Sequence, residues 1–219
     1  VISDENKTLC QDGVHLGGGC RRGAIRNIIA ENGATNDDLI AFNADDAYDY
    51  RHNHYLFPEE ISDITVDNVI AENCWTAVRM LSVEAPIRNV TVKNLIAGVR
   101  EMGLNFDATR YAGDRIFDPA AYPCGVGNIE NVRFENVVLW KTRDKDTPLC
   151  VIESNCRGVV FENFARNLDR DVMPGEPFFR FDNLAETAVY VDGETTVLSC
   201  GERKTLGGGA YRKITVDRN

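Results

Sequence analysis

The sequence has little of what marks several common classes of protein. None of its stretches approaches the roughly 18 apolar residues that a membrane-spanning helix needs. It also has no cluster of Lys and Arg that could attract nucleic acid, and its formal net charge is −10. We therefore expect neither a membrane nor nucleic acid as a partner, although a locally basic cleft is compatible with this overall charge.

The N-terminus lacks both an initiator Met and a visible signal peptide. The chain begins Val1-Ile2-Ser3-Asp4 and runs at once into patterned sequence. We expect residues upstream of this start to be missing or to have been removed, and the compartment is left open.

Cysteine motifs are absent as well. The seven cysteines contain no CxxC pair, so the usual zinc and redox motifs are excluded, and their number is odd. We interpret them mainly as small buried hydrophobic residues, with one or two disulfides as the alternative for an exported protein. They are Cys10, Cys20, Cys74, Cys124, Cys150, Cys156 and Cys200.

What the sequence does have is an internal repeat with the pattern apolar-x-apolar-x-Asn-apolar, degenerate only at Ala24. The repeated residues are Asn27, Asn68, Asn94, Asn136 and Asn163. Their separations of 41, 26, 42 and 27 residues indicate coils of about 26 residues, two of which carry about 15 extra residues in a loop. Alternation with period two predicts strands. The Asn fits a tight bend after each strand and could stack into a ladder.

This pattern predicts an all-β fold, a right-handed parallel β-helix (a solenoid) that lacks its N-terminal coils. We expect a single domain over residues 1–219, with coils from 10 to 183 and an irregular C-terminal segment, 184–219.

A second strand is expected after each repeated Asn. Four of its side chains should point inward: Ile40, Val78, Leu104 and Val151. The residues between them should face outward as a possible binding groove: Ala41, Arg79, Asn105 and Ile152 or Arg180. Two insertions, Ala44 to Glu60 and Ala108 to Gly127, carry aromatic residues that either pack sugar rings or pack on the wall of the fold.

Three carboxylates are predicted to meet on this face. Asp12, in Gln11-Asp12-Gly13, and Asp38 are separated by 26 residues, one coil, so they should stack about 4.8 Å apart with Asp37 beside them. Their mutual repulsion should raise at least one pKa. Glycoside hydrolysis needs one protonated and one ionised carboxyl group. The alternative is that Asp-Gly and Asn-Asp-Asp are ordinary turn residues.

These segments resemble a known family. Gln11-Asp12-Gly13-Val14 and Asn36-Asp37-Asp38-Leu39-Ile40-Ala41-Phe42 look like the Asn-Thr-Asp-Gly and Gly-Asp-Asp-Cys-Ile-Ala-Ile motifs of glycoside hydrolase family 28, the polygalacturonases. The likeness is close over residues 10–43 and beyond that covers only the coil pattern. Family members are inverting β-helix hydrolases of pectic polymers. The resemblance therefore implies Asp37 as general acid, and Asp12 and Asp38 as the pair that activates water.

Two departures from the family bear on the substrate. Its Gly-His-Gly motif would fall near Cys74-Trp75-Thr76-Ala77, where no His stands. Its Arg-Ile-Lys motif, which binds the substrate carboxylate, would fall near Leu104-Asn105-Phe106-Asp107, where both bases are replaced. A neutral or differently charged sugar is therefore an alternative to galacturonic acid, with Asn105 and Asp107 as candidate contacts.

Three histidines could take the place of the missing one. His15 lies two residues past the Asp12-Gly13 turn and should face the groove, and His52 and His54 stand on a loop that could fold over it. Each has an alternative as a surface or packing residue.

Arg79 is the best-placed cation of the groove. It could bind a substrate carboxylate or hold Asp38 ionised, or it could be a surface residue paired with a neighbouring Asp. Arg110 is a weaker candidate.

The leading hypothesis is a hydrolase of an oligo- or polysaccharide that uses neither metal nor cofactor. One alternative is a β-helix lyase or epimerase that uses calcium, for which Asp45, Asp46 and Asp49 are candidates without a known loop spacing. Another is a non-catalytic carbohydrate-binding β-helix. The resemblance implies an extracellular or periplasmic location, and the cytoplasm is the alternative. The sequence leaves the oligomeric state open.

Overall fold

The computed structural model describes residues 11–31, 33–45, 58–108, 125–182 and 185–218. These residues form fourteen strands and no helix, so the structure is all-β as the period-two alternation predicts. The strands are β1 (Val14–Gly17), β2 (Arg21–Ala30), β3 (Asp38–Asn43), β4 (Ile61–Leu81), β5 (Ile87–Asp107), β6 (Ile129–Lys141), β7 (Cys150–Ile152), β8 (Cys156–Arg157), β9 (Val159–Arg166), β10 (Phe179–Asp182), β11 (Thr187–Val191), β12 (Glu194–Leu198), β13 (Arg203–Leu206) and β14 (Ala210–Arg218).

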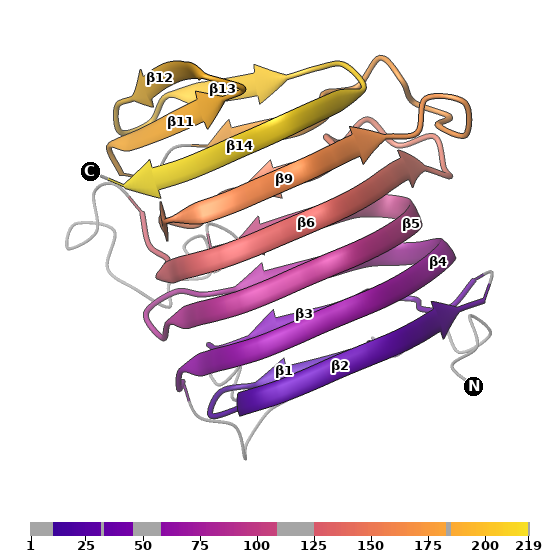
Figure 1. The fold of residues 1–219 in the computed structure, drawn as a ribbon, viewed down its shortest axis with the longest axis horizontal. Helices are drawn as coiled ribbons and strands as arrows, with labels where there is room; N and C mark the ends of the chain where they lie inside the picture. Colours follow the sequence, from indigo (N-terminus) through magenta and orange to yellow (C-terminus); the bar gives the residue numbers. More distant parts are fainter. Residues whose placement is uncertain (1–10, 32, 46–57, 109–124, 183–184, 219) are drawn as a thin grey trace.

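The strands join into one large, mostly parallel sheet that is not closed on itself. Strands β4, β5, β6 and β9 follow one another as parallel neighbours, and β2 pairs with the first half of β4. The short strand β1 pairs in parallel with β3, and β3 pairs in parallel with the second half of β4. Figure 1 shows the long strands stacked from β2 to β14, with β1 and β3 behind them.

The strand register reproduces the repeat seen in the sequence. Ile64 pairs with Val90, a step of 26 residues, and Val90 pairs with Val132, a step of 42. Phe134 pairs with Phe161, a step of 27. These steps equal the separations of the repeated Asn residues, so the repeat length is the step from one parallel strand to the next, which is consistent with one coil per repeat.

The repeated Asn residues form the expected ladder at a bend within each long strand. All five have positive φ, between 49° and 61°, where few side chains other than Asn are tolerated. The Asn68 amide donates to the Asn27 side-chain oxygen at 2.8 Å, and the Asn163 amide donates to that of Asn136 at 3.1 Å. Asn94 departs from the pattern and donates to Asp67.

A second ladder, which the repeat pattern did not reveal, lies five residues earlier in the chain in each repeat. Asp63, Asn89, Asn131 and Gly158 also have positive φ. The Asn89 amide donates to Asp63, and the Asn131 amide donates to Asn89 at 2.8 Å. The two ladders bracket the same strand segments and fix their register.

Alternate side chains of the long strands fill the interior. Val66, Val92, Phe134 and Phe161 stack in one fully buried column. The Phe134 and Phe161 rings are stacked with centroids 5.5 Å apart. Full burial of such a side chain contributes roughly 1.5–3 kcal/mol, so the core strongly favours the stacked register.

The C-terminal segment differs from the irregular end that its weak pattern indicated. Strands β11 to β14 are regular and antiparallel. β14 pairs with β9 from Ala210–Ala165 to Val216–Val159 and so covers the last parallel strand (Figure 1). Antiparallel pairing needs only short turns and no long crossover, which explains why the 26-residue repeat is absent here.

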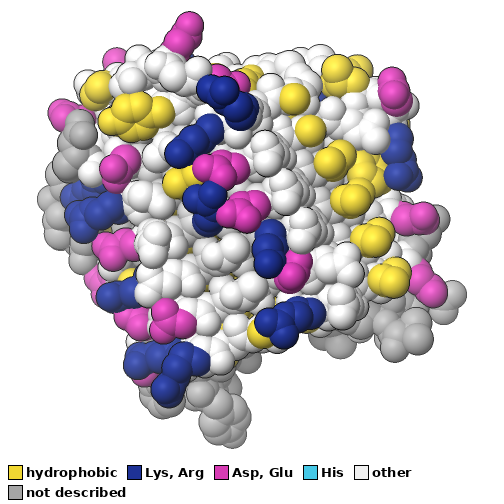
Figure 2. Space-filling view, viewed as in Figure 1, with side chains coloured by type: hydrophobic (Ala, Val, Ile, Leu, Met, Phe, Trp, Pro, Cys, Tyr) yellow, Lys and Arg dark blue, Asp and Glu magenta, His cyan; other side chains and the backbone are white. Residues whose placement is uncertain are grey.

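The face of the long strands carries charged side chains that pair with one another (Figure 2). Lys93 lies 3.4 Å from Asp67, and Lys213 lies 3.6 Å from Glu162. Arg133 also pairs with Glu162 across β6 and β9. These contacts join neighbouring strands, so we assign this charged stripe to the fold. No helix among the described residues is long and apolar enough to cross a membrane.

Candidate active site

The short strands carry a continuous row of side chains opposite their core-facing side, called here the outer row. Consecutive strands pair these residues directly: His15, Ala41, Arg79, Asn105, Val151 and Arg180. Ala41, Arg79 and Val151 in this row are buried, so the expectation that the whole row is exposed was wrong. The expectation that Ala41, Arg79 and Asn105 share one face is confirmed, and His15 joins them. Val151 was expected to point inward. That was wrong by one residue, because Cys150 rather than Val151 pairs with Leu104.

The three predicted carboxylates meet at the start of this row. One carboxylate oxygen from each of Asp12, Asp37 and Asp38 lies within 4.8 Å of the other two. The Asp38 backbone N–H donates to the Asp12 carboxylate at 3.1 Å, and the Gly13 N–H donates to the Asp38 carbonyl at 2.9 Å. The predicted stacking of Asp12 on Asp38 is therefore confirmed.

Gly13 is required beside Asp12 because the next layer passes very close to it. A Cβ atom at Gly13 would lie 2.5 Å from the Leu39 carbonyl oxygen. Real Cβ atoms do not approach an oxygen so closely, so any other residue would push the two layers apart. The Asp12-Gly13 pair thus both forms a turn and contributes a carboxylate to the site, so the two interpretations of it do not exclude each other.

His15 contacts the acid that precedes it. Its Nδ1 lies 2.6 Å from Oδ2 of Asp12, and about a third of the His15 side chain is exposed, at 38%. This contact holds the carboxylate in one orientation. His15 thus lies beside the trio and in the outer row.

Asp38 is the most deeply buried of the three acids, at 3% exposure. Burial raises the pKa of Asp38 from 3.8 to about 7, opposed by the positive charge of Arg79 and reinforced by the negative charges of Asp37 and Asp12. A raised pKa within the trio was expected from mutual repulsion, and Asp38 has one, but burial is a larger cause than the neighbouring charges. Near neutral pH the site thus holds a proton that a fully solvated carboxyl would have lost.

Arg79 lies against the trio and is itself buried, at 8% exposure. Its guanidinium lies 3.6 Å from Oδ2 of Asp38 and donates to Oδ2 of Asp107 at 3.0 Å. Of the roles considered for Arg79, the geometry supports electrostatic control of Asp38. Its engagement with two carboxylates disfavours a role as a free receptor for a substrate carboxylate.

Asn105 and Asp107 lie at one side of a shallow depression of about 250 Å³ farther along the outer row. Met102, Pro148 and Val151 form its apolar part. Glu153 and Arg180 complete it, and the Arg180 guanidinium donates to Glu153 at 2.8 Å. The depression therefore continues the same face that carries the acid trio.

The alternative in which Arg79 pairs with an Asp of a neighbouring strand is confirmed by Asp107, although Arg79 is buried and not a surface residue. Sequence reasoning did not single out Asp107 as that partner, nor Glu153 as a neighbour of the row. Asp107 and Arg79 are 28 residues apart, close to one repeat, and this spacing was an available signal. Glu153 stands beside a strand whose register had been set one residue off, so its place in the row was hidden.

Trp75 forms a further cluster beside the trio. It directly precedes Thr76, which pairs with Asp38. The guanidinium carbons of Arg100 and Arg143 each lie 5.6 Å from the Trp75 ring centroid, a cation–π arrangement. Nothing in the repeat pattern indicated this grouping, because the two arginines come from later repeats.

The acid trio also has the spacing of a small cation site, since three carboxylate oxygens converge there. However, Arg79 already supplies a positive charge 3.6 Å from Asp38, and His15 contacts Asp12. The positive charge of Arg79 offsets part of the negative charge that would attract a divalent cation.

Asp45 has a structural role in place of the calcium-binding role considered for it. Its fully buried carboxylate accepts hydrogen bonds from the backbone N–H groups of Val83, Glu84 and Ala85. Burial raises its pKa to about 6, against the lowering effect of these bonds. Asp46 and Asp49 lie outside the described residues.

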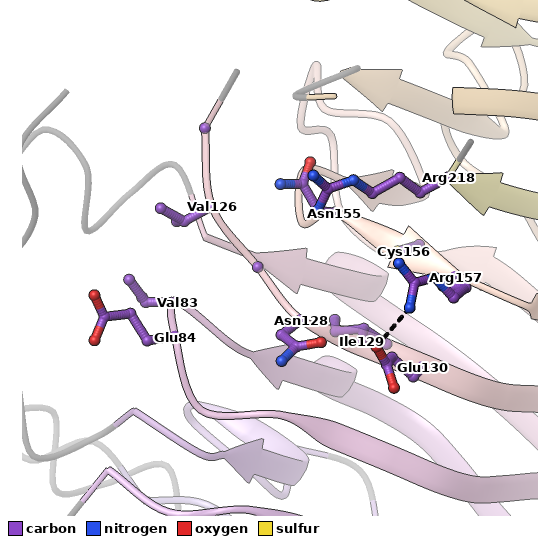
Figure 3. A pocket seen from close by; sticks show the side chains of 12 residues that line it. Val83, Glu84, Val126, Asn128, Ile129, Glu130, Asn155, Cys156, Arg157 and Arg218 are labelled. Carbon is purple, nitrogen blue, oxygen red and sulfur yellow. Dashed lines mark hydrogen bonds and ion pairs between the residues drawn. The ribbon is translucent and has the colours of Figure 1, made fainter. Parts of the chain in front are cut away.

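A separate cavity of about 570 Å³ lies between the turn after β4 and the start of β6. Figure 3 shows Asn128, Asn155 and Arg218 around it, with Arg157 paired to Glu130 at 3.4 Å. None of the predicted site residues lines it, so we assign it no part in the site.

Several other predictions fall outside the site or outside the described residues. His52, His54 and Arg110 belong to segments that the structure does not describe. Among the described cysteines none forms a disulfide, and Cys74, Cys150 and Cys156 are buried, as the hydrophobic interpretation predicts. Cys20 is half-buried and Cys200 is exposed.

Comparison of the chain with family models, with curated proteins and with solved structures gave no match.

Proposed function

We propose that the protein is a glycoside hydrolase built on a right-handed parallel β-helix, and that it cleaves a pectin-like or related polysaccharide. The observation that carries the proposal is the convergence of Asp12, Asp37 and Asp38 within 4.8 Å, with Asp12 and Asp37 half-buried and Asp38 buried. Cleavage of a glycosidic bond needs a proton donor and a base that activates water, and this trio can supply both. The likeness of residues 10–43 to polygalacturonase motifs supports the same reaction.

The reaction assigns a proton path to the trio. The acid donates its proton to the glycosidic oxygen as the bond from that oxygen to the anomeric carbon breaks. A water molecule adds to the anomeric carbon, and its proton passes to an ionised carboxylate. Asp12 is suited to the base role because His15 holds its carboxylate at 2.6 Å.

Two residues compete for the acid role. The resemblance implies Asp37, whereas burial favours a proton on Asp38 near neutral pH. A substrate whose leaving group needs no protonation separates them. The variant of the true acid, Asp37→Asn or Asp38→Asn, will cleave an aryl glycoside far better than the natural linkage. The variant of a base will be impaired on both.

The resemblance also implies inversion at the anomeric carbon. Inverting enzymes usually separate their carboxyl groups by about 6.5–9.5 Å, and the nearest oxygens of this trio are closer than that. The closer spacing favours retention, whereas the resemblance favours inversion, and we propose inversion. NMR of the first product formed records which anomer appears.

The experiment that tests the proposal is a screen of plant and microbial polysaccharides for new reducing ends. Asp37→Asn and Asp38→Asn should each abolish release from whichever polymer is cleaved. Asp169→Asn is the matched control, because Asp169 is exposed and distant in sequence from the trio. Undiminished hydrolysis by both trio variants would reject the proposal. Tight saccharide binding without turnover would favour a non-catalytic β-helix.

The raised pKa of Asp38 and the cation-like spacing of the trio favour one second candidate, a uronate lyase. Such an enzyme abstracts a proton next to a carboxylate that calcium neutralises. Its product is unsaturated and absorbs in the ultraviolet. An ultraviolet-absorbing product that no longer forms when calcium is chelated would establish the lyase. New reducing ends without any ultraviolet-absorbing product would establish the hydrolase.

A further inference from the structure

We propose that the depression beside Asn105 is a subsite for a neutral sugar ring, so that the substrate carries an uncharged pyranose two to four units from the bond that is cleaved. This inference rests on the proposed hydrolase function and specifies its substrate. It is carried by the charge and the shape of the depression, which are independent of the chemistry of the trio.

The position of the depression follows from strand register. Asn105 is two strands from Ala41 along the outer row, and Arg180 is four strands away. Neighbouring strands are about 4.8 Å apart, so these residues lie on the order of 10 and 19 Å from Ala41, which shares strand β3 with Asp38. The strand spacing resembles the rise of one sugar unit in an extended glycan. A chain laid along the row thus places its third to fifth units over the depression.

The charges in the depression are unsuited to a carboxylated sugar. Asp107 and Glu153 are both acidic. Arg180 is the one cation among the described residues that line the depression, and it donates to Glu153 at 2.8 Å and to Asp182 at 2.7 Å. Arg79, the next cation along the row, donates to Asp107. A uronate would therefore meet like charges and cations that are already engaged, and like charge disfavours binding.

The remaining lining suits a neutral ring. Met102, Pro148 and Val151 offer an apolar surface of the kind that packs on the C–H face of a sugar, and Asn105 offers both a hydrogen-bond donor and an acceptor. Glu153 can accept from a hydroxyl group. The volume of about 250 Å³ is slightly below that of pockets for drug-sized ligands, which fits one ring better than a longer segment.

The test uses two sets of oligosaccharides that differ only in charge. Oligogalacturonides of two to six units are compared with the same oligomers after carboxyl reduction to galactose units. Binding to the full chain carrying Asp37→Asn is measured by titration calorimetry, so that turnover plays no part. We expect the reduced oligomers of four or more units to bind at least tenfold more tightly than the charged ones, and the dimers to show no such preference.

Two variants locate the preference in the depression. Asn105→Lys should raise the affinity for charged oligomers of four or more units at least tenfold, and Asn105→Ala should weaken the neutral ones several-fold. Glu130→Gln is the matched control, since Glu130 pairs with Arg157 outside the outer row.

Three results would overturn the subsite. They are tighter binding of the charged oligomers, no binding of either set, and equal effects of the Asn105 variants at every chain length. Failure of the hydrolase proposal would appear elsewhere, as retained cleavage by both trio variants. The experiments therefore distinguish a hydrolase that acts on a charged substrate from a protein that binds a neutral glycan without cleaving it.

Discussion

The Arg79 guanidinium donates to the Asp107 carboxylate at 3.0 Å, and both side chains are almost fully buried. The same guanidinium lies 3.6 Å from Asp38. One cation on β4 thus stands between two buried acids on the flanking strands β3 and β5, and it lowers the pKa of Asp38 against the larger effect of burial.

Replacing Arg79 by Met should both destabilise the protein and change the site. Loss of one partner from a buried ion pair typically costs about 3–5 kcal/mol. Because Arg79 lowers the pKa of Asp38, its removal should also raise that pKa. We expect a lower free energy of unfolding in urea and, if Asp38 is the acid, a basic limb of kcat/KM displaced to higher pH.

The double variant Arg79→Met with Asp107→Asn provides the control for this prediction. It removes the carboxylate that the single variant leaves without its cation, so part of the stability should return. A double variant as unstable as the sum of the two single variants would contradict direct coupling between these residues.

Asp38 should make the stability depend on pH. Its pKa is raised from 3.8 unfolded to about 7 folded, so the folded protein binds this proton more tightly. The resulting stabilisation is complete below the unfolded pKa and is lost as pH rises through about 7. The change is at most about 4 kcal/mol, from 1.36 kcal/mol per pKa unit.

Thermal unfolding of the parent and of Asp38→Asn between pH 4 and 8 measures this contribution. The parent should lose more stability over that range than the variant, whose amide does not titrate. The remaining slope includes Asp45, which is unchanged in both proteins. Parallel pH profiles would show that the Asp38 pKa is not raised on folding.

Asp45 should matter for stability and not for catalysis. Asp45→Ala removes the acceptor of the Val83, Glu84 and Ala85 N–H groups, and a buried N–H without a partner costs roughly 1–3 kcal/mol. Asp45→Asn keeps one oxygen and should cost less. We expect the Tm of Asp45→Ala to fall by roughly 2–4 °C for each kcal/mol lost. A fall in kcat of Asp45→Ala without a fall in its Tm would contradict this structural role.

The Asn ladder makes a prediction that separates backbone strain from hydrogen bonding. Asn136 has φ of 55°, accepts from Asn163 and donates to Asn94. Asn136→Gly loses the hydrogen bonds but keeps the backbone angle accessible, whereas Asn136→Ala loses both. We expect the Ala variant to be less stable than the Gly variant by about 1 kcal/mol in urea unfolding. Equal stabilities would indicate that the left-handed bend carries no cost for Ala.

Much of the fold could be predicted because it repeats. An Asn at a bend recurs once in each repeat, and apolar residues alternate along the chain between these bends. The strands, the repeat length and the stacking of Asp12 on Asp38 can therefore be predicted from residue spacing alone. The place of Val151 in the outer row, with Cys150 in the inward position, could not be predicted in this way. Its strand is three residues long, too short for alternation to distinguish one register from the next.

The sequence by itself determined that strands stack in layers and that three carboxylates meet, because period and spacing are properties of the chain. Only the tertiary structure decided which acid is buried and which cation reaches it. Arg79, Asp38 and Asp107 come from three different strands, and their pairing depends on packing and side-chain direction. Those are properties of the assembled sheet. The same holds for the antiparallel pairing of β14 with β9, where the chain no longer follows the repeat.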